Sequence, residues 1–163
     1  MKKKADSNFT IVVDSREKLP YEYPGAVCKA LACGDYSILG YENHVAIERK
    51  THEDAYSSLG SGRERFEREL KRLASLDYAA IVVESTLDGF LKAPAFTRMN
   101  PKAAVNSIIA WSVKYKVCVF FAGSRDMGRA LTYRLLEKFL KYEKEREIGR
   151  HKTSLERLPP EGA

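Results

Sequence analysis

Glu48 and Lys50 are the residues whose types and spacing point most directly to chemistry. They lie in the run of residues 45–50, where apolar and β-branched side chains predict a β-strand. Because side chains alternate between the two faces of a strand, Glu48 and Lys50 share one face. Asp35 opens the preceding predicted strand, and it approaches Glu48 if the two strands pair through the turn at residues 41–43.

Two carboxylates and one ammonium group at one place suit the hydrolysis of a phosphodiester. Carboxylate oxygens are ligands of Mg²⁺, which keeps several waters and binds the substrate phosphate. The ion polarises the phosphoryl oxygen and lowers the pKa of a bound water. A nearby lysine positions or deprotonates the attacking water, or stabilises the charge that develops. The arrangement therefore predicts a metal-dependent site that hydrolyses a phosphodiester.

Four short motifs build this site in a fixed order along the chain. They are Asp14-Ser15-Arg16-Glu17, Gly34-Asp35-Tyr36, Glu48-Arg49-Lys50 and Asp54. The last three resemble the GD-x(n)-ERK-x(3)-D pattern of the XPF family of structure-specific endonucleases, which belongs to the PD-(D/E)XK nuclease superfamily. The first resembles the D-x-R-E motif of the same family. A D…ExK pattern alone is weak and arises by chance, whereas the extended pattern is specific. The similarity covers residues 11–84 and, more loosely, the chain to residue 139.

The resemblance implies a role for each matched residue. It implies that Asp35 and Glu48 bind Mg²⁺ or Mn²⁺, that Lys50 is the catalytic lysine, and that Asp54 supports catalysis from the following helix. Three further side chains are implied to orient the site or to contact phosphate: Asp14, Arg16 and Arg49. The resemblance also implies an endodeoxyribonuclease that cuts branched DNA, such as flaps and forks, and acts in DNA repair.

Structural interpretations stay open beside these roles. Asp35 fits a turn residue, and Glu48 with Lys50 fits a solvated strand face, although Glu, Arg and Lys in succession form strands poorly. Asp54 fits the first turn of a helix capped by Thr51, where a carboxylate suits the helix dipole. Two supporting residues have such interpretations as well: a cap of its own loop backbone for Asp14, and a snorkelling side chain for Arg49.

The net charge of +6 and the sequence pI of about 9.2 favour a polyanionic partner, and nucleic acid is the commonest one. A basic helix is expected to begin near Ser61. Three of its cations are predicted to contact DNA phosphates or, alternatively, to form a solvated face: Arg63, Arg65 and Lys71. Tyr21 and Tyr23 are candidates for stacking on bases, whereas Trp111 is expected in the core.

The expected fold is α/β, with a restriction-endonuclease-like central mixed β-sheet flanked by α-helices. Strands are predicted at residues 9–14, 27–31, 35–39, 44–49, 78–84 and 117–121, and helices after residues 51, 62, 100 and 124. The first four strands are compatible with an antiparallel meander. The later order of strand, helix and strand implies a parallel, right-handed crossover. The last helix is predicted to bury Met127, Leu131, Leu135 and Phe139.

The length of 163 residues fits a single domain at 8–148, with flexible tails at 1–7 and 149–163. Three cysteines, Cys28, Cys33 and Cys118, are expected to be reduced thiols in the core. No apolar run reaches the length of a membrane span, and no signal peptide is recognisable. We therefore expect a cytoplasmic protein, nucleoid-associated or phage-encoded.

Larger members of the family that the chain resembles carry a tandem helix-hairpin-helix module after the nuclease domain and pair with a second subunit. After Phe139 only one helix and a tail are expected here, without paired Gly-x-Gly hairpins. This pattern predicts a stand-alone nuclease domain of the bacterial or phage type. The apolar second half, with Trp111 and the last helix, is expected to provide a homodimer face.

Three alternatives remain at this level. The first is a resolvase-like or restriction-like nuclease with the same core that acts on a different DNA structure. The second is a catalytically silent DNA-binding subunit or scaffold of a nuclease complex, which should have lost the acidic and lysine set that this chain keeps. The third is a basic interaction protein without nucleic-acid chemistry, which predicts no binding of divalent metal.

Overall fold

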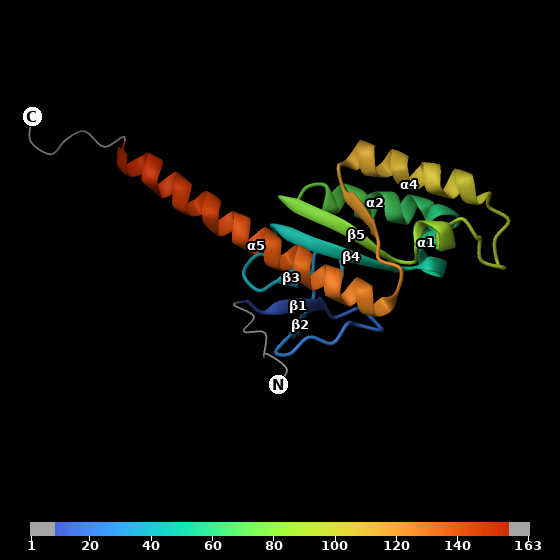
Figure 1. Ribbon diagram of the computed structural model, residues 1–163, viewed down its shortest axis with the longest axis horizontal. Helices are drawn as coiled ribbons and strands as arrows, with labels where there is room; N and C mark the ends of the chain where they lie inside the picture. Colours follow the sequence, from blue (N-terminus) through green and yellow to red (C-terminus); the bar gives the residue numbers. More distant parts are fainter. Residues whose placement is uncertain (1–8, 157–163) are drawn as a thin grey trace, which may run out of the picture.

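Six strands form one mixed sheet in the order β2-β1-β3-β4-β5-β6, which confirms the α/β class (Figure 1). The computed structural model describes residues 9–156, with side chains up to residue 150. The strands are β1 (Ile11–Asp14), β2 (Val27–Lys29), β3 (Tyr36–Ile38), β4 (Val45–Thr51), β5 (Tyr78–Glu84) and β6 (Cys118–Phe121). The helices are α1 (His52–Leu59), α2 (Arg63–Leu73), α3 (Leu87–Phe90), α4 (Pro101–Tyr115) and α5 (Arg125–Glu156). The predicted tail at 1–7 lies outside the described residues, and the predicted tail from 149 is helical as far as Glu156.

The first four strands do not form the predicted antiparallel meander. Strand β2 pairs in parallel with β1 at the edge of the sheet, and β3 inserts antiparallel between β1 and β4. The connection between β1 and β2 is too long for a hairpin, and its middle is held against α5, where the Tyr23 hydroxyl donates to the Arg129 carbonyl and Arg125 lies over the Tyr21 ring. The chain therefore returns to its starting end before β2 begins. Strands β4, β5 and β6 are parallel, as predicted for the second half.

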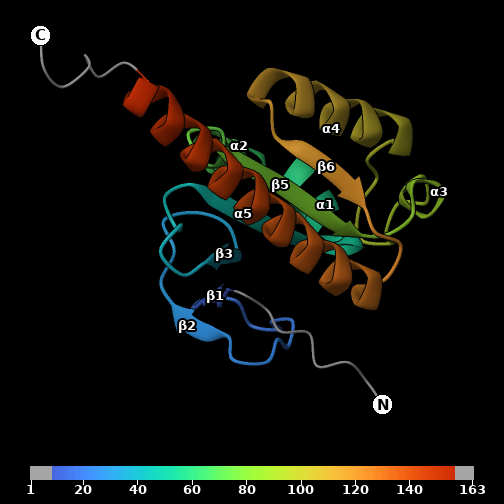
Figure 2. The ribbon, with the colours of Figure 1, turned by 60° about the vertical axis from the view of Figure 1, so that its left-hand side comes forward.

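Side-chain alternation along β4 and β5 divides the core into two clusters. Ala46 and Val83 face α1, α2 and α4, whereas Ile47 and Val82 face α5. Figures 1 and 2 show the same division, with α5 alone across one face of the sheet and the shorter helices on the other. Neighbouring residues of β4 therefore lie in different environments. The same alternation places the charged residues at its carboxyl end on opposite faces of the sheet.

Helix α5 buries a stripe that is displaced from the predicted one. Met127 is 60% exposed, and the fully buried positions are Thr132 and Leu136. The rotation of α5 about its axis is fixed in its first turns. There Gly128 approaches Tyr21 so closely that an added Cβ would lie 2.3 Å from the phenol oxygen. Phe139 is buried as predicted.

Two of the three cysteines are exposed, which corrects the expectation of three core thiols. Cys28 lies on β2 and Cys118 on β6, and both are edge strands, whereas Cys33 is buried. All three are free. In residues 9–156 no helix combines the length and the apolar composition needed to cross a membrane.

Candidate active site

The backbone of Gly34 and Asp35 lies very close to β4. Gly34 has a φ of +71°, and a Cβ there would lie 2.8 Å from the Cβ of Ala46. The Asp35 amide donates to the carbonyl oxygen of Ile47 at 2.9 Å, and the Asp14 amide donates to the carbonyl of Asp35 at 2.8 Å. The Asp35 side chain then accepts the Arg49 amide at 2.7 Å. Backbone bonds on both sides thus fix this carboxylate at the end of β4.

Glu48 and Lys50 project from the same face of β4, as alternation predicts. Lys50 Nζ lies 3.0 Å from Glu48 Oε1, and both side chains are largely buried. The ammonium also lies over the Phe66 ring, 4.5 Å from its centroid. Glu69 of α2 stands close enough to act on the Glu48 carboxylate. The lysine is therefore held between carboxylate and aromatic ring, in a pocket that excludes most water.

The two central carboxylates resist ionisation. Burial, followed by the nearby Glu48 carboxylate, raises the pKa of Asp35 from its usual 3.8 to about 8. Burial also raises the pKa of Glu48, although Lys50 opposes that change. Strongly shifted carboxyl groups at one place are typical of catalytic and metal-binding sites. A divalent cation would favour the charged form of both.

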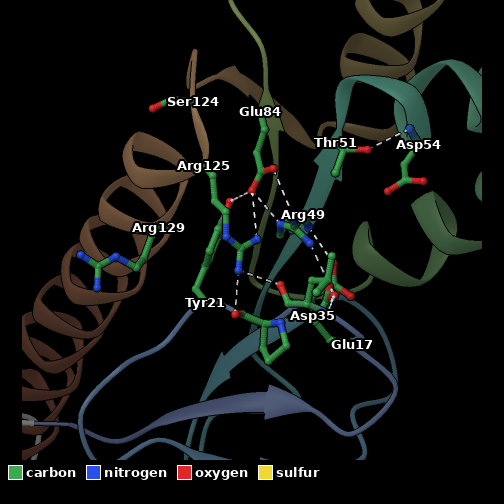
Figure 3. A network of polar contacts seen from close by, with 12 residues as sticks. Glu17, Tyr21, Asp35, Arg49, Thr51, Asp54, Glu84, Ser124, Arg125 and Arg129 are labelled. Carbon is green, nitrogen blue, oxygen red and sulfur yellow. Dashed lines mark hydrogen bonds and ion pairs between the residues drawn. The ribbon is translucent and has the colours of Figure 1, made fainter. Parts of the chain in front are cut away.

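Arg49 points to the opposite face of β4 and enters a different network (Figure 3). Its guanidinium pairs with both carboxylate oxygens of Glu84, at 2.7 and 3.1 Å, and lies 3.5 Å from Glu17 Oε1. The Tyr21 hydroxyl donates to the same Glu84 at 2.7 Å. Burial would raise the pKa of Glu84, but the hydrogen bonds from Arg49 and Tyr21 outweigh it, and the pKa is lowered. Every charge here has a partner.

Helix α5 joins this network through its first residue. Arg125 lies 3.8 Å from Glu84 Oε1, stacks over the Tyr21 ring at 5.0 Å, and donates to the backbone carbonyls of Leu19 and Pro20 at 3.0 and 2.8 Å. In Figure 3 the start of α5, the end of β5 and the loop after β1 converge on these contacts. The network therefore ties α5 to the strand that carries Glu48 and Lys50.

Asp14 and Arg16 form a separate pair beside the site. Arg16 Nε donates to Asp14 at 2.9 Å, and the Leu31 amide donates to the same carboxylate at 2.8 Å. Burial raises the pKa of Asp14, but these hydrogen bonds outweigh it and hold the pKa below its usual value. Arg16 keeps 68% of its side chain exposed, so its guanidinium is accessible to a ligand.

Asp54 lies apart from the buried set. It is exposed in the first turn of α1, where its amide donates to Thr51 Oγ1 at 3.1 Å. Thr51 is the N-cap that the sequence predicted, and Figure 3 shows Asp54 beyond Thr51 at the start of α1, away from Asp35. Its position satisfies the capping interpretation, and its catalytic role stays a prediction.

The three predicted DNA-contacting cations lie on α2 and are all exposed: Arg63, Arg65 and Lys71. Arg63 stacks over the Trp111 ring at 4.8 Å and lies 3.7 Å from Glu67. Trp111 is buried, as predicted. Tyr21 is only 2% exposed and stacks on Tyr36, so the expectation that it stacks on bases is wrong. Its hydroxyl is instead committed to Glu84.

Sequence reasoning missed two members of the network, Glu84 and Arg125. A signal existed for Glu84, because it is an acidic residue that ends the otherwise apolar strand β5. Arg49 pairs in register with Val82, so Glu84 follows two residues later on the same face. Arg125 had no such signal, since its partners lie about a hundred positions away in the chain.

The carboxylates fit a magnesium or manganese ion that shares its coordination with water and substrate. Within residues 9–156 there is no group of three or more His, Cys, Asp or Glu side chains arranged to enclose a metal. Asp35 and Glu48 provide two oxygen-donor side chains, and Mg²⁺ is usually bound by one or two carboxylates together with substrate phosphate. The raised pKa of Asp35 is the second observation that fits, because the pair lacks enough positive charge of its own.

Comparison with known proteins supplies a family. The family model described as "ERCC4 domain" matches residues 13–135, a range that includes all the residues of the site. No curated protein matches the chain. Two solved structures are similar. The first is XPF from Aeropyrum pernix, with a TM-score of 0.60 and 23% identity over 80% of this chain and 60% of that chain. The second is XPF from Aeropyrum pernix in complex with DNA, with a TM-score of 0.63 and 23% identity over 83% of this chain and 66% of that chain. At that identity the likeness shows the fold, and this chain spans less than two thirds of either relative.

Proposed function

The chain belongs to the ERCC4 domain family, and from that premise we propose that it is a Mg²⁺- or Mn²⁺-dependent endodeoxyribonuclease. The observation that carries the proposal is the convergence of Asp35, Glu48 and Lys50. They come from two parts of the chain, and the backbone bonds around Asp35 and the Lys50–Glu48 contact hold them at one end of β4. The raised pKa of Asp35 supports the proposal, because a bound cation would stabilise the ionised carboxylate.

The residues divide the chemical work by position. Asp35 and Glu48 would hold the metal ion, which when bound supplies a water of lowered pKa and polarises the phosphoryl oxygen. Lys50 would orient the attacking water or stabilise the negative charge on the phosphate, from a position fixed by Glu48 and Phe66. Arg16, exposed beside the site, would contact a backbone phosphate. Asp54 would support the site from α1.

The substrate we propose is branched DNA, such as a flap or fork, in a repair process. The net charge of +6 supports a polyanionic partner. The relative solved in complex with DNA supports the same class of partner for this fold. The exposed cations of α2 would follow the DNA backbone: Arg63, Arg65 and Lys71.

A homodimer is the second part of the proposal. Trp111 is buried and contributes no surface, but the outer side of α4 exposes Ile109 at 56% and Val113 at 73% beside the edge strand β6. Light scattering or sedimentation across a concentration range would measure the mass of the particle. A monomer at the highest concentration would rule out the homodimer.

Cleavage assays test the enzyme assignment. Labelled flap, fork, four-way and linear duplex DNA would be incubated with Mg²⁺ or Mn²⁺ and with wild type, Glu48→Gln or Lys50→Ala. Lys138→Ala, a change of an exposed lysine on α5, serves as the matched control. We expect metal-dependent cutting that only the two site variants abolish. Cutting of linear duplex alone would replace flap specificity with a restriction-like activity. Tight binding without cutting under either metal would identify a DNA-binding subunit instead.

A further inference from the structure

The segment between Asp88 and Asp126 has an unusual charge pattern. It contains no carboxylate and six cations, although acidic and basic residues are mixed through the rest of the chain. The cations are Lys92, Arg98, Lys102, Lys114, Lys116 and Arg125. An acid-free stretch of this length attracts a polyanion and has no internal partner for most of its charges.

Apolar side chains are exposed in the same segment. Phe96 is 61% exposed, and Leu87 and Leu91 nearby are 49% and 42% exposed. Single exposed apolar residues need no explanation, but a group within ten positions marks an interaction surface. Phe96 stands between Lys92 and Arg98, both exposed, and within residues 9–156 neither of them makes an ion pair.

Local bonds hold Phe96 at the tip of the loop between α3 and α4. The Thr97 amide donates to the carbonyl of Pro94 at 3.2 Å, which makes residues 94–97 a turn with Phe96 at its third position. The Met99 amide donates to Thr97 Oγ1 at 3.2 Å, and Asn100 caps α4 by accepting two amides. The ring is therefore presented to solvent by a preorganised turn.

The loop rises next to the candidate active site. Its base is Phe90, which is fully buried, and whose carbonyl accepts the Tyr56 hydroxyl of α1 at 2.6 Å. The Phe90 ring also lies 5.3 Å from Phe121 and 5.4 Å from His52, which follows Lys50 by two residues. In Figures 1 and 2 the loop lies at the end of the molecule where β4 enters α1 and where α5 begins.

We propose that the loop between α3 and α4 binds unpaired nucleotides of DNA, with a base stacked on Phe96 and backbone phosphates held by Lys92 and Arg98. This inference rests on the proposed function, since it identifies which part of a DNA substrate reaches this side of the site. Proteins that bind single strands combine cations along the backbone with exposed aromatic rings that stack on bases. The loop has both components in seven residues, and the buried Phe90 anchors it beside the catalytic strand.

Binding measurements without divalent metal test the loop apart from cleavage. A labelled single-stranded oligonucleotide and a blunt duplex of the same length would be titrated with wild type and Phe96→Ala. One stacked base contributes about 1–3 kcal/mol, so we expect single-strand affinity to fall about 5- to 150-fold and duplex affinity to change less than about 2-fold. Lys92→Ala and Arg98→Ala should each reduce the salt dependence of single-strand binding by about one released ion.

Tyr142 offers a matched control, because it is an aromatic ring, 53% exposed, with Lys141 Nζ at 5.5 Å, on the distant part of α5. Tyr142→Ala should bind single strands as wild type does. An equal loss in Tyr142→Ala, or no loss in Phe96→Ala, would overturn the inference.

A fluorescence experiment gives direct evidence of stacking. Trp111 is the only tryptophan and is buried, and Phe96→Trp adds a second reporter whose signal is read as the difference from the wild-type response, since Arg63 stacks over Trp111. Quenching by the oligonucleotide is expected for Phe96→Trp and not for Tyr142→Trp. A response of Phe96→Trp to anionic lipid vesicles, with none to DNA, would assign the loop to membranes and refute the proposal. If wild type cuts flaps and Phe96→Ala binds normally, only this inference fails. If single-strand binding depends on Phe96 but no metal supports cutting, only the enzyme assignment fails.

Discussion

The two faces of β4 at its carboxyl end carry opposite kinds of electrostatics within three consecutive residues. On one face, Glu48 and Lys50 share a pocket in which the pKa of Glu48 and of neighbouring Asp35 is raised. On the other, Arg49 and Glu84 form a paired network in which the pKa of Glu84 is lowered. Burial raises the pKa of the carboxylates on both faces; at Glu84 the surrounding hydrogen bonds outweigh it, and at Asp35 and Glu48 they do not.

The groups that oppose burial differ between the two faces. Glu84 accepts hydrogen bonds from Arg49 and Tyr21 and faces Arg125 as a third positive or polar group. Asp35 and Glu48 are two carboxylates with one lysine between them. A carboxylate whose charge is balanced by hydrogen-bond donors and cations stabilises the folded chain. A carboxylate without enough such partners is available to a ligand. The comparison predicts that activity depends on one face and folding stability on the other.

The largest expected effect is on cleavage. Glu48→Gln should reduce the cleavage rate about 10²- to 10⁴-fold, because it removes a metal ligand and the partner of Lys50. Its free energy of unfolding, measured by urea titration without metal, should stay close to that of wild type, because the Gln amide oxygen still accepts a hydrogen bond from Lys50 while the burial cost of a carboxylate is removed. A variant that lost both stability and cleavage would show that Glu48 supports the fold, and the contrast between the two faces would disappear.

On the opposite face, Glu84→Ala should lower the free energy of unfolding by about 3–5 kcal/mol, because it leaves the buried Arg49 guanidinium with only its 3.5 Å contact to Glu17. Urea unfolding curves followed by circular dichroism give the measurement. Glu137→Ala, which breaks the exposed pair with Arg134, provides the control and should cost less than about 1 kcal/mol. Equal costs for the two variants would contradict the role assigned to the network.

The pH dependence of stability should reveal Asp35. Its pKa is about 8 in the folded protein and usually 3.8, so the folded state retains a proton that the unfolded state loses above about pH 4. The stabilisation from that proton is complete below pH 4 and disappears as the pH rises to 8. Asp35→Asn keeps an acceptor for the Arg49 amide and should be more stable than wild type at pH 9 by a few kcal/mol, at about 1.4 kcal/mol for each pKa unit. Saturating Mg²⁺ should raise the melting temperature of wild type alone, and identical pH profiles for the two proteins would contradict this account.

The smallest expected effect concerns the contact of α5 with the paired network. Gly128→Ala places a methyl group 2.3 Å from the Tyr21 phenol oxygen and should cost about 1–3 kcal/mol by displacing Tyr21 from Glu84. Gly149→Ala, where an added Cβ meets nothing within 4 Å, should be neutral or slightly stabilising. Thermal unfolding of both variants would decide. A neutral Gly128→Ala would show that the network tolerates a shift of α5.

Local patterns in the sequence predicted the face of β4 that carries Glu48 and Lys50. They did not predict the network of Arg49 and Glu84 on the other face. Alternation in β4 placed Glu48 with Lys50, and the expected pairing of the two strands through the turn at residues 41–43 brought Asp35 toward Glu48. These relations lie within two successive strands and depend on strand geometry alone. The contacts of Arg49 with Glu84, and of Arg125 with the loop after β1, span 35 and about a hundred positions. Such contacts exist only once the sheet order is fixed.

The errors in the predicted fold have the same origin. The edge position of β2 depends on the preceding loop, which Tyr21 and Tyr23 hold against α5. The rotation of α5 about its axis depends on its contact with Tyr21. Neither constraint appears in propensity or periodicity. The parallel second half was predictable because a helix between two strands leaves few other arrangements.

Helix α5 is also a lever. Its 32 residues span about 48 Å at 1.5 Å per residue, and Figure 1 shows its far half projecting beyond the sheet. Its near half is fixed at two places: the first turn, where Arg125 shares Glu84 with Arg49, and the buried Phe139 and Leu140. A bend of about 10° after Leu140 would displace the end of the helix by about 4 Å. Conversely, a load on the projecting end is transmitted to the residues that brace β4, so a torque applied far from Glu48 and Lys50 is mechanically connected to the strand that carries them.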